Sequence, residues 1–187
     1  MFGLPSLSDL NIGATLPVTL LVFGACVLLV VDLFVPRDRK RVTALLTCAG
    51  IGLSLLLSLL SLGGVIELGN GDDAFTGMFR ADALTEAINV ATLMVALLGV
   101  LVAYDYLERT GMQRGEYYIL LLFSAAGAML MGAANNLVIV FIALELLSIP
   151  LYILSGFRRP EAASEESAMK YFLLGAFSSG FLIYGIA

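Results

Sequence analysis

Histidine and tryptophan are both missing from this chain of 187 residues, and cysteine occurs only at Cys26 and Cys48. Zinc, haem and iron–sulfur centres take imidazole ligands or clustered thiolates, so we predict that the chain holds no metal and no cofactor of its own. Hydrolases that rely on a histidine base are excluded for the same reason. The two cysteines stand apart in apolar runs, and we interpret them as small buried hydrophobic residues.

Charged residues are also scarce. They make up 13% of the chain, against roughly a quarter in a soluble domain, whereas 60% of the residues are hydrophobic and the mean hydropathy is +0.99. The net charge of -5 argues against a nucleic-acid partner. The composition therefore predicts a membrane protein in contact with the lipid bilayer.

Continuous apolar runs of about 20 residues, the length that spans a hydrocarbon core as a helix, recur along the chain. Membrane-spanning strands would show shorter segments with alternating polarity, which these runs lack. We predict an all-α polytopic membrane protein that forms a single transmembrane domain. The expected spanning helices are 12–35, 42–66, 83–104, 117–134, 137–157 and 164–187.

The distribution of basic residues predicts the orientation, because cytoplasmic loops keep lysine and arginine. Most basic residues follow the first, third and fifth predicted helices, whereas Glu67, Asp72, Asp73 and Asp82 lie on the other side with Arg80. We expect an outside N-terminus and a first helix that is an uncleaved anchor. The basic loop residues are Arg37, Arg39, Lys40, Arg41, Arg109, Arg114, Arg158 and Arg159.

Short polar signals lie between the runs. Asp82 can cap the third helix, and a short extended piece is expected around 75–80. Only Asn135 and Asn136 separate the fourth and fifth helices, which must form a tight antiparallel hairpin. Stripes of small residues let helices approach closely, and we interpret both stripes as packing surfaces. They consist of Ser124, Ala128 and Gly132 on the fourth helix, and of Gly175 and Ser179 on the sixth.

Glu145 lies near the middle of the fifth helix, where an ionisable side chain is costly to insert. Ser148 and Tyr152 follow it on the same helical face, so a carboxyl, a hydroxyl and a phenol form one stripe. Pro150 has no N–H and frees the carbonyl of Leu146, which predicts a kink and a hydrated backbone site. We interpret this stripe as a proton or ion site; the alternative is a protonated glutamate that bonds a neighbouring helix.

Lys170 lies about 9 Å inside the sixth helix, with Glu166 one turn earlier on the same face. The residues alone leave two interpretations equally open, a functional lysine and an anchoring ion pair. A direct salt bridge to Glu145 is not expected, whereas the difference in depth leaves room for a relay through water.

Three other polar residues lie near the ends of spans. Asp32 is expected to pair with the basic loop that begins at Arg37. Glu86 and Asn89, near the outer end of the third helix, are expected at the membrane interface.

The stretches LELLSIPLYIL and AMKYFLLGA, at their spacing in this chain, resemble subunit N of NADH-quinone oxidoreductase, respiratory complex I. The resemblance is strong from Glu116 to Ala187. It implies an antiporter-like subunit of about fourteen helices, of which these are the first six. We therefore expect the chain to continue beyond Ala187, with the partner lysine of Glu145 on a later helix.

The resemblance also implies a function. Glu145 matches the essential glutamate of the fifth helix and Lys170 the lysine of the sixth, and both would relay protons. The chain would be a subunit of a proton-pumping translocase in the bacterial inner membrane, beside other membrane subunits of complex I. NAD, FMN, iron–sulfur clusters and quinone would be bound by partner subunits, and this chain would neither carry a redox centre nor bind quinone directly.

Two alternatives stay open. The same fold serves subunits of multisubunit Na+/H+ antiporters and of membrane-bound hydrogenases. The chain could also be a purely structural membrane subunit, with Glu145 joining two helices.

Overall fold

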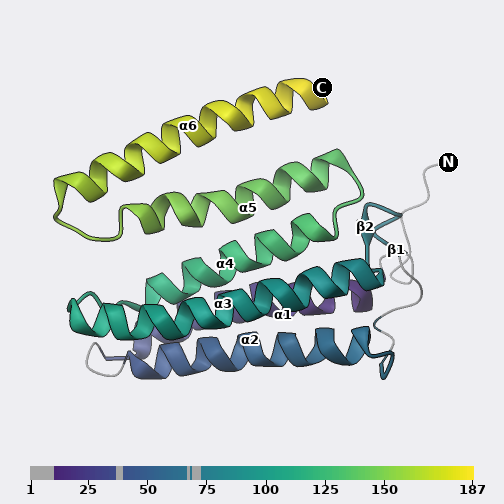
Figure 1. Ribbon diagram of the computed structural model, residues 1–187, viewed down its shortest axis with the longest axis horizontal. Helices are drawn as coiled ribbons and strands as arrows, with labels where there is room; N and C mark the ends of the chain where they lie inside the picture. The colour runs from purple at the N-terminus through teal and green to yellow at the C-terminus, as the bar shows by residue number, and fades with distance from the viewer. Residues whose placement is uncertain (1–10, 37–39, 67, 69–72) are drawn as a thin grey trace.

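Six long helices make up most of the computed structural model, which describes residues 11–36, 40–66, 68 and 73–187 (Figure 1). All six are long and apolar enough to cross a membrane, which confirms the predicted all-α fold and its six spans. After a short 3-10 turn, η1 (Ile12–Thr15), the helices are α1 (Leu16–Phe34), α2 (Arg41–Leu62), α3 (Ala83–Arg109), α4 (Gly115–Gly132), α5 (Leu137–Ser155) and α6 (Ala162–Ile186).

Helix α3 extends beyond the predicted end at residue 104 and stops at Arg109. Its last turn is polar, and Arg109 pairs with Asp105 at 3.0 Å across one turn. Thr110 is the C-cap of the helix, and Gly111, with its φ of +67°, follows it. At about 1.5 Å per residue it is some 40 Å long, so it outlasts a hydrocarbon core of about 30 Å.

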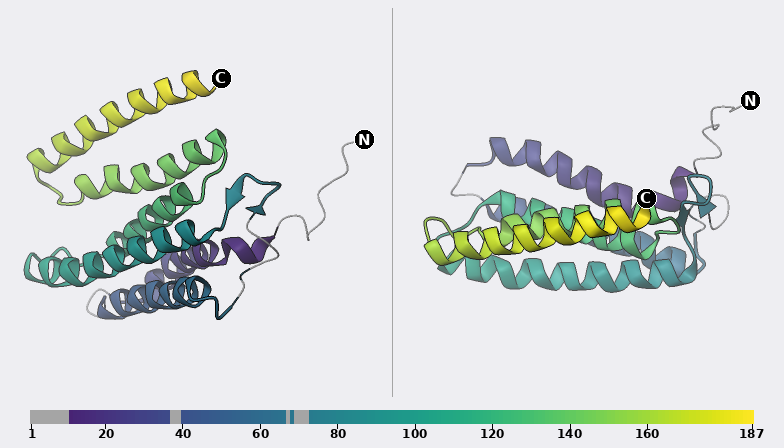
Figure 2. Two further views of the ribbon diagram at one scale, coloured as in Figure 1. Left: turned by 45° about the vertical axis from the view of Figure 1, so that its right-hand side comes forward. Right: turned by 90° about the horizontal axis from the view of Figure 1, so that it is seen from above.

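Helices α1 to α4 form a bundle, here called the N-terminal bundle, and α5 and α6 form an antiparallel pair, the α5–α6 hairpin. The core runs through the bundle and includes Leu21, Ile51, Leu93 and Leu122, each at most 1% exposed. Helix α5 packs on α4, and α6 packs on the far side of α5 (Figures 1 and 2). Helix α6 has no buried residue.

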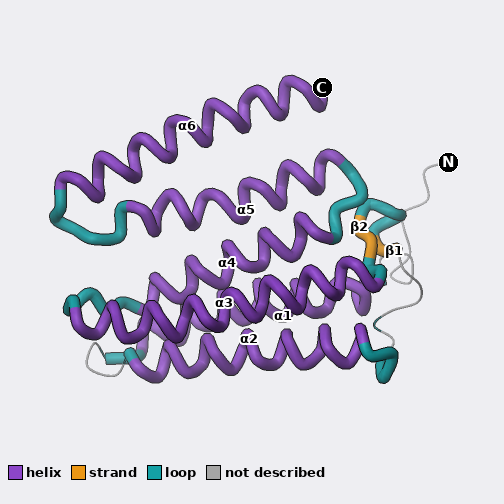
Figure 3. The backbone as a smooth tube through the Cα atoms, viewed as in Figure 1, coloured by secondary structure: helices purple, strands orange, loops and turns teal. Residues whose placement is uncertain are grey.

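Helices α1, α3 and α5 all end, and their connections to the next helices begin, at one end of the molecule, here called the basic end (Figure 3). An ion pair of 2.6 Å between Arg41 and Glu108 joins the start of α2 to the end of α3 there. The described basic residues of these connections therefore gather on one side, as the orientation argument requires. Four residues used in that argument lie outside the described part of the chain: Arg37, Arg39, Glu67 and Asp72.

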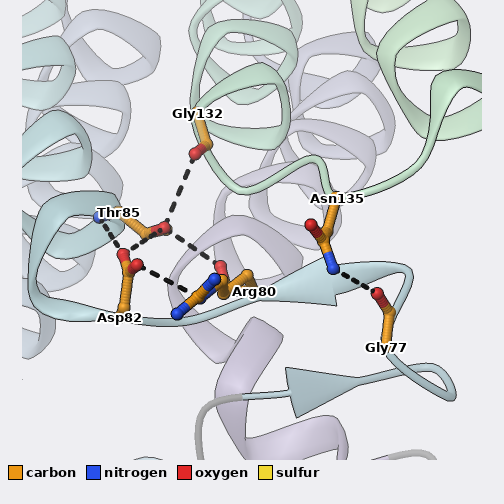
Figure 4. Close-up of polar contacts among 6 residues, drawn as sticks. All are labelled: Gly77, Arg80, Asp82, Thr85, Gly132 and Asn135. Carbon is orange, nitrogen blue, oxygen red and sulfur yellow. Dashed lines mark hydrogen bonds and ion pairs between the residues drawn. The ribbon is translucent and has the colours of Figure 1, made fainter.

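The opposite end, here called the hairpin end, carries a small antiparallel sheet of β1 (Asp73–Ala74) and β2 (Phe79–Arg80) beside the turn between α4 and α5. The extended piece predicted around 75–80 is thus a hairpin. Asn135 binds its turn from the α4–α5 connection: its backbone N–H donates to Met78 O at 3.0 Å and its side chain to Gly77 O at 2.8 Å (Figure 4).

The start of α3 is fixed at the same end. Asp82 caps the helix as predicted, because its carboxylate accepts the Thr85 N–H at 2.9 Å. This hydrogen bond lowers the pKa of the Asp82 carboxyl below its ordinary value. The Thr85 hydroxyl also donates to Arg80 O at 3.0 Å and lies 3.5 Å from Gly132 O (Figure 4). Strand β2, α3 and α4 are thereby joined at one point.

Candidate functional site

Glu145 lies in the middle of α5 and faces α6. Its carboxylate Oε1 accepts a hydrogen bond of 2.5 Å from the Ser179 hydroxyl of α6. The side chain is half-buried in the α5–α6 interface. A carboxylate held by one hydroxyl is less constrained than one held by a countercharge, and its oxygens can accept further hydrogen bonds.

The two side chains predicted on the same face as Glu145 are buried in this region. Ser148 is 7% and Tyr152 is 9% exposed. The Tyr152 ring makes an edge-to-face contact with Tyr171, at a centroid distance of 4.7 Å, and its phenol end lies where a Cβ on Gly175 would be. The absence of a side chain at position 175 therefore makes room for Tyr152.

An open groove of about 390 Å³ leads from the basic end toward this face. It lies between α5 and α6, and Tyr152 forms part of its wall. Tyr152 is two helical turns, or about 10 Å, from Glu145 along α5. Charged side chains at the groove include Arg159 and Glu165, so the groove is polar where it meets the basic end.

Pro150 is accommodated inside a continuous α5. A Cβ on Gly127 of α4 would come within 2.8 Å of the Leu146 carbonyl carbon and 2.4 Å of the Leu147 backbone nitrogen. Helix α4 thus lies directly on the backbone where Pro150 was predicted to leave a hydrated carbonyl. The predicted stripe on α4 did not include Gly127, which makes this close approach; Gly132 of that stripe packs on Ile88 of α3 instead.

Lys170 does not meet Glu145. Its ammonium group pairs with Glu166 at 2.5 Å, one turn earlier on α6, and its side chain is 70% exposed. Ser179, the partner of Glu145, is nine residues further along α6, which corresponds to about 13 Å along the axis. In the described part of the chain no direct salt bridge joins Lys170 to Glu145, as expected from their different depths.

Ser179 was missed as a site residue, because the sequence analysis interpreted Gly175 and Ser179 as packing positions only. That interpretation holds for Gly175 and is wrong for Ser179, which hydrogen-bonds Glu145. The sequence carries no signal for this contact. Helix α5 ends at Ser155 and α6 begins at Ala162, so Ser179 is several residues farther from the connection than Glu145 is, and equal spacing from the loop does not pair them.

Three other expectations concern the N-terminal bundle. Asp32 does pair with the basic connection, through Lys40 at 2.7 Å, and also accepts the Thr43 hydroxyl at 2.7 Å. Glu86 and Asn89 lie near the start of α3, but their side chains are buried, at only 4% and 2% exposed. The expectation of interfacial side chains is therefore wrong, because both turn into the bundle.

The two cysteines also differ from expectation. Cys26 is exposed on α1 and Cys48 is half-buried, so neither is a fully buried core residue. In the part of the chain that the structure describes, no group of three or more His, Cys, Asp or Glu side chains could hold a metal ion.

The comparisons with known proteins address the same helices. The family model described as the membrane region of NADH:quinone oxidoreductase and Mrp antiporters matches residues 134–187. This range contains α5 with Glu145, and α6 with Ser179. Over 168 residues the chain is 43% identical to NADH-quinone oxidoreductase subunit N 2 of Roseiflexus castenholzii, covering 89% of this chain and 32% of that protein. Subunit N of Herminiimonas arsenicoxydans is 36% identical over 97% of this chain and 37% of its own length. The chain belongs to the NADH-quinone oxidoreductase subunit N family.

A solved structure agrees with this assignment. A chain in respiratory complex I from Thermus thermophilus with bound Aureothin matches with a TM-score of 0.71 and 28% identity, over 90% of this chain and 35% of that one. The chain thus spans about a third of the length of the relatives it matches.

Proposed function

We propose that this chain is part of a proton-translocating membrane subunit of NADH-quinone oxidoreductase and that Glu145 is one of its proton-carrying groups. The observation that carries the proposal is the position of Glu145: an ionisable side chain in mid-span, half-buried between two helices and held by one hydroxyl. An intramembrane carboxyl that faces a neighbouring helix is typical of proton pathways.

The surrounding groups support a route from the basic end. The groove between α5 and α6 reaches Tyr152, and Ser148 and Glu145 follow on the same face of α5. A proton from this side would pass along water and hydroxyl groups to the Glu145 carboxyl. Moving a charge against 100 mV costs about 2.3 kcal/mol, which is within the range of one buried acid that changes its environment.

Lys170 has a different place in this proposal. It lies at the surface near the groove, where its charge, paired with Glu166, can set the local field at the start of the route. In the full subunit a lysine on a later helix would approach Glu145 and change its proton affinity. NAD, FMN, iron–sulfur clusters and quinone would be bound by partner subunits, and other membrane subunits of complex I would flank this one.

The proposed location is the bacterial inner membrane, with the basic end in the cytoplasm and the hairpin end outside. The retained lysine and arginine side chains at one end support this orientation. The six helices would be one part of a larger transmembrane domain.

Replacement of Glu145 by Gln in the intact complex tests the relay. Gln keeps the hydrogen bond with Ser179 but cannot carry a proton, so the complex should assemble while proton pumping falls at least tenfold. Native gels report assembly, and the quenching of a pH-sensitive dye in vesicles reports pumping. Glu116→Gln, an exposed glutamate of α4, is the matched control. Normal assembly with full pumping would contradict the relay, and failed assembly would favour the structural alternative.

Lys170→Met distinguishes the two interpretations of the lysine. If Lys170 tunes the route, pumping falls and its pH profile shifts while assembly is normal. If the lysine only anchors α6, pumping is unchanged and a Glu166→Gln variant behaves in the same way.

A cation/proton antiporter subunit is the second candidate, since the matching family model covers both classes. Copurification decides between them, because flavin and iron–sulfur subunits accompany complex I and not the antiporter.

A further inference from the structure

Glu86 and Asn89 lie in the first two turns of α3 and face α2. Glu86 is 4% exposed and Asn89 is 2% exposed, and Ser58 of α2, which is fully buried, lies against the Glu86 carboxyl. This interface belongs to the N-terminal bundle and is separate from the α5–α6 interface that holds Glu145. The relay proposed above does not use this carboxyl.

No countercharge faces Glu86 among the residues that the structure describes. Arg80 lies nearest in sequence, but it pairs with Asp82 at 3.3 Å and its side chain is 56% exposed. An isolated carboxylate in such a buried place loses its hydration without compensation, so the neutral acid is favoured. The other described charged residues on α1 to α4 belong to the basic end, at the far side of the bundle: Asp32, Arg41, Asp105, Glu108, Arg109 and Glu116.

If Glu86 is ionised, the cluster of Glu86, Asn89 and Ser58 lacks hydrogen-bond partners for some of its buried polar atoms. The Asn89 Nδ2 group donates to Glu86 Oε2 at 3.4 Å, while the buried Asn89 Oδ1 and Ser58 Oγ atoms make no regular hydrogen bond. An ionised carboxylate has no hydrogen to offer to Asn89 Oδ1, so two acceptors would be left together in a buried place. Buried polar atoms of this kind are nearly always paired.

One proton on the Glu86 carboxyl completes the pairing. The neutral acid has an O–H group, which can donate to Asn89 Oδ1 while Asn89 Nδ2 donates back to the other carboxyl oxygen. The Ser58 hydroxyl can rotate to donate to the same carboxyl group. We propose that Glu86, Asn89 and Ser58 form a second proton-binding site, in which Glu86 stays protonated at neutral pH and pairs face to face with the Asn89 carboxamide.

Infrared spectroscopy of the full-length subunit in its assembled complex tests the proposal. A protonated carboxyl has a C=O stretching band that carboxylates lack and that shifts in D2O. We expect the difference spectrum between wild type and Glu86→Gln at pH 7 to show one such band, and that of Glu116→Gln to show none. Glu116 is the matched control, because both acids lie in the first turn of a spanning helix. A Glu86→Gln spectrum without a lost band would overturn the proposal.

Assembly gives a second criterion. The glutamine carboxamide can form the same neutral pair with Asn89, so Glu86→Gln should assemble to the wild-type level on native gels. Failed assembly would show that the negative charge is needed and would also overturn the proposal. In Asn89→Leu the Glu86 band should move to higher frequency, because the carboxyl loses its acceptor; an unmoved band would contradict the pairing.

Discussion

The N-terminal bundle and the α5–α6 hairpin differ in how much of each region is buried within the chain, and each contains an ion pair that illustrates the difference. In the most apolar stretch of α4, 44% of the residues are buried within the chain, against 6% in α6. The Asp32–Lys40 pair of the bundle is 12% and 10% exposed, whereas the Glu166–Lys170 pair of the hairpin is 65% and 70% exposed. The segments that pack around each pair therefore decide how far its charged side chains are exposed.

The largest difference between the two regions is expected when one member of each ion pair is removed. Asp32→Ala leaves the buried Lys40 without its carboxylate and Thr43 without its acceptor, which should lower the free energy of unfolding by about 3 kcal/mol. Glu166→Ala should change it by less than about 1 kcal/mol, since the partner stays hydrated. Thermal unfolding of the detergent-solubilised subunit measures both. Equal losses of unfolding free energy would mean that the Glu166–Lys170 pair is as well shielded from water as the Asp32–Lys40 pair.

A smaller difference in the free energy of unfolding is expected when a methyl group is added at a close helix contact in each region. Gly127→Ala forces α4 away from the backbone of α5 at Leu147, and we expect a cost of about 1–3 kcal/mol. In Gly175→Ala the nearest atoms belong to the phenol end of the Tyr152 side chain and not to a helix backbone, so its cost should be smaller.

Gly50→Ala is the matched control for both substitutions, because no atom lies within 4 Å of an added Cβ there. Alanine favours the helix by up to about 1 kcal/mol over glycine, so this variant should be neutral or more stable. The same unfolding assay compares all three. If Gly175→Ala cost more than Gly127→Ala, the hairpin would be the more rigid region.

The smallest difference is expected at the helix starts. Asp82 caps α3 with its side chain, whereas the Glu161 side chain makes no capping hydrogen bond at α6. Asp82→Ala should cost about 1 kcal/mol, Asp82→Asn much less, and Glu161→Ala little.

The pKa of Asp82 gives this contribution a pH dependence. Because the pKa is lowered in the folded chain, the stabilisation is present above the unfolded value of about 4 and is lost as the pH falls through the folded value. Unfolding measured between about pH 5 and pH 2 should show this acid loss for wild type and not for Asp82→Asn. The same loss in both would assign it to other carboxyl groups.

The sequence predicts the six spans and their order, because a continuous apolar run in a membrane satisfies its backbone hydrogen bonds by forming one long helix. It also predicts the Asp82 cap and the tight turn at Asn135. The polar last turn of α3 was not foreseen, since hydropathy marks only the part of a helix that lies in lipid, and Asp105 and Arg109 continue it beyond that part.

The site was less predictable. The stripe from Glu145 to Tyr152 follows from helical periodicity alone, but the contact of Glu145 with Ser179 depends on the register of two helices. The burial of Glu86 depends on α2, whose buried polar side chains include Ser58, which lies against the Glu86 carboxyl. Such a polar face in an otherwise apolar helix has no signal in a hydropathy average.

The bonds of the α4–α5 turn to the β-hairpin have a mechanical consequence. Asn135 is held twice by the hairpin turn, and Arg80 N–H donates to Ala133 O at 2.8 Å just before it. The hairpin in turn leads directly into the capped start of α3. The start of α5 is therefore anchored to the bundle by hydrogen bonds, while the rest of the helix is held by its packing on α4. Any tilt of α5 on α4 must displace the basic end of α5 more than its anchored start.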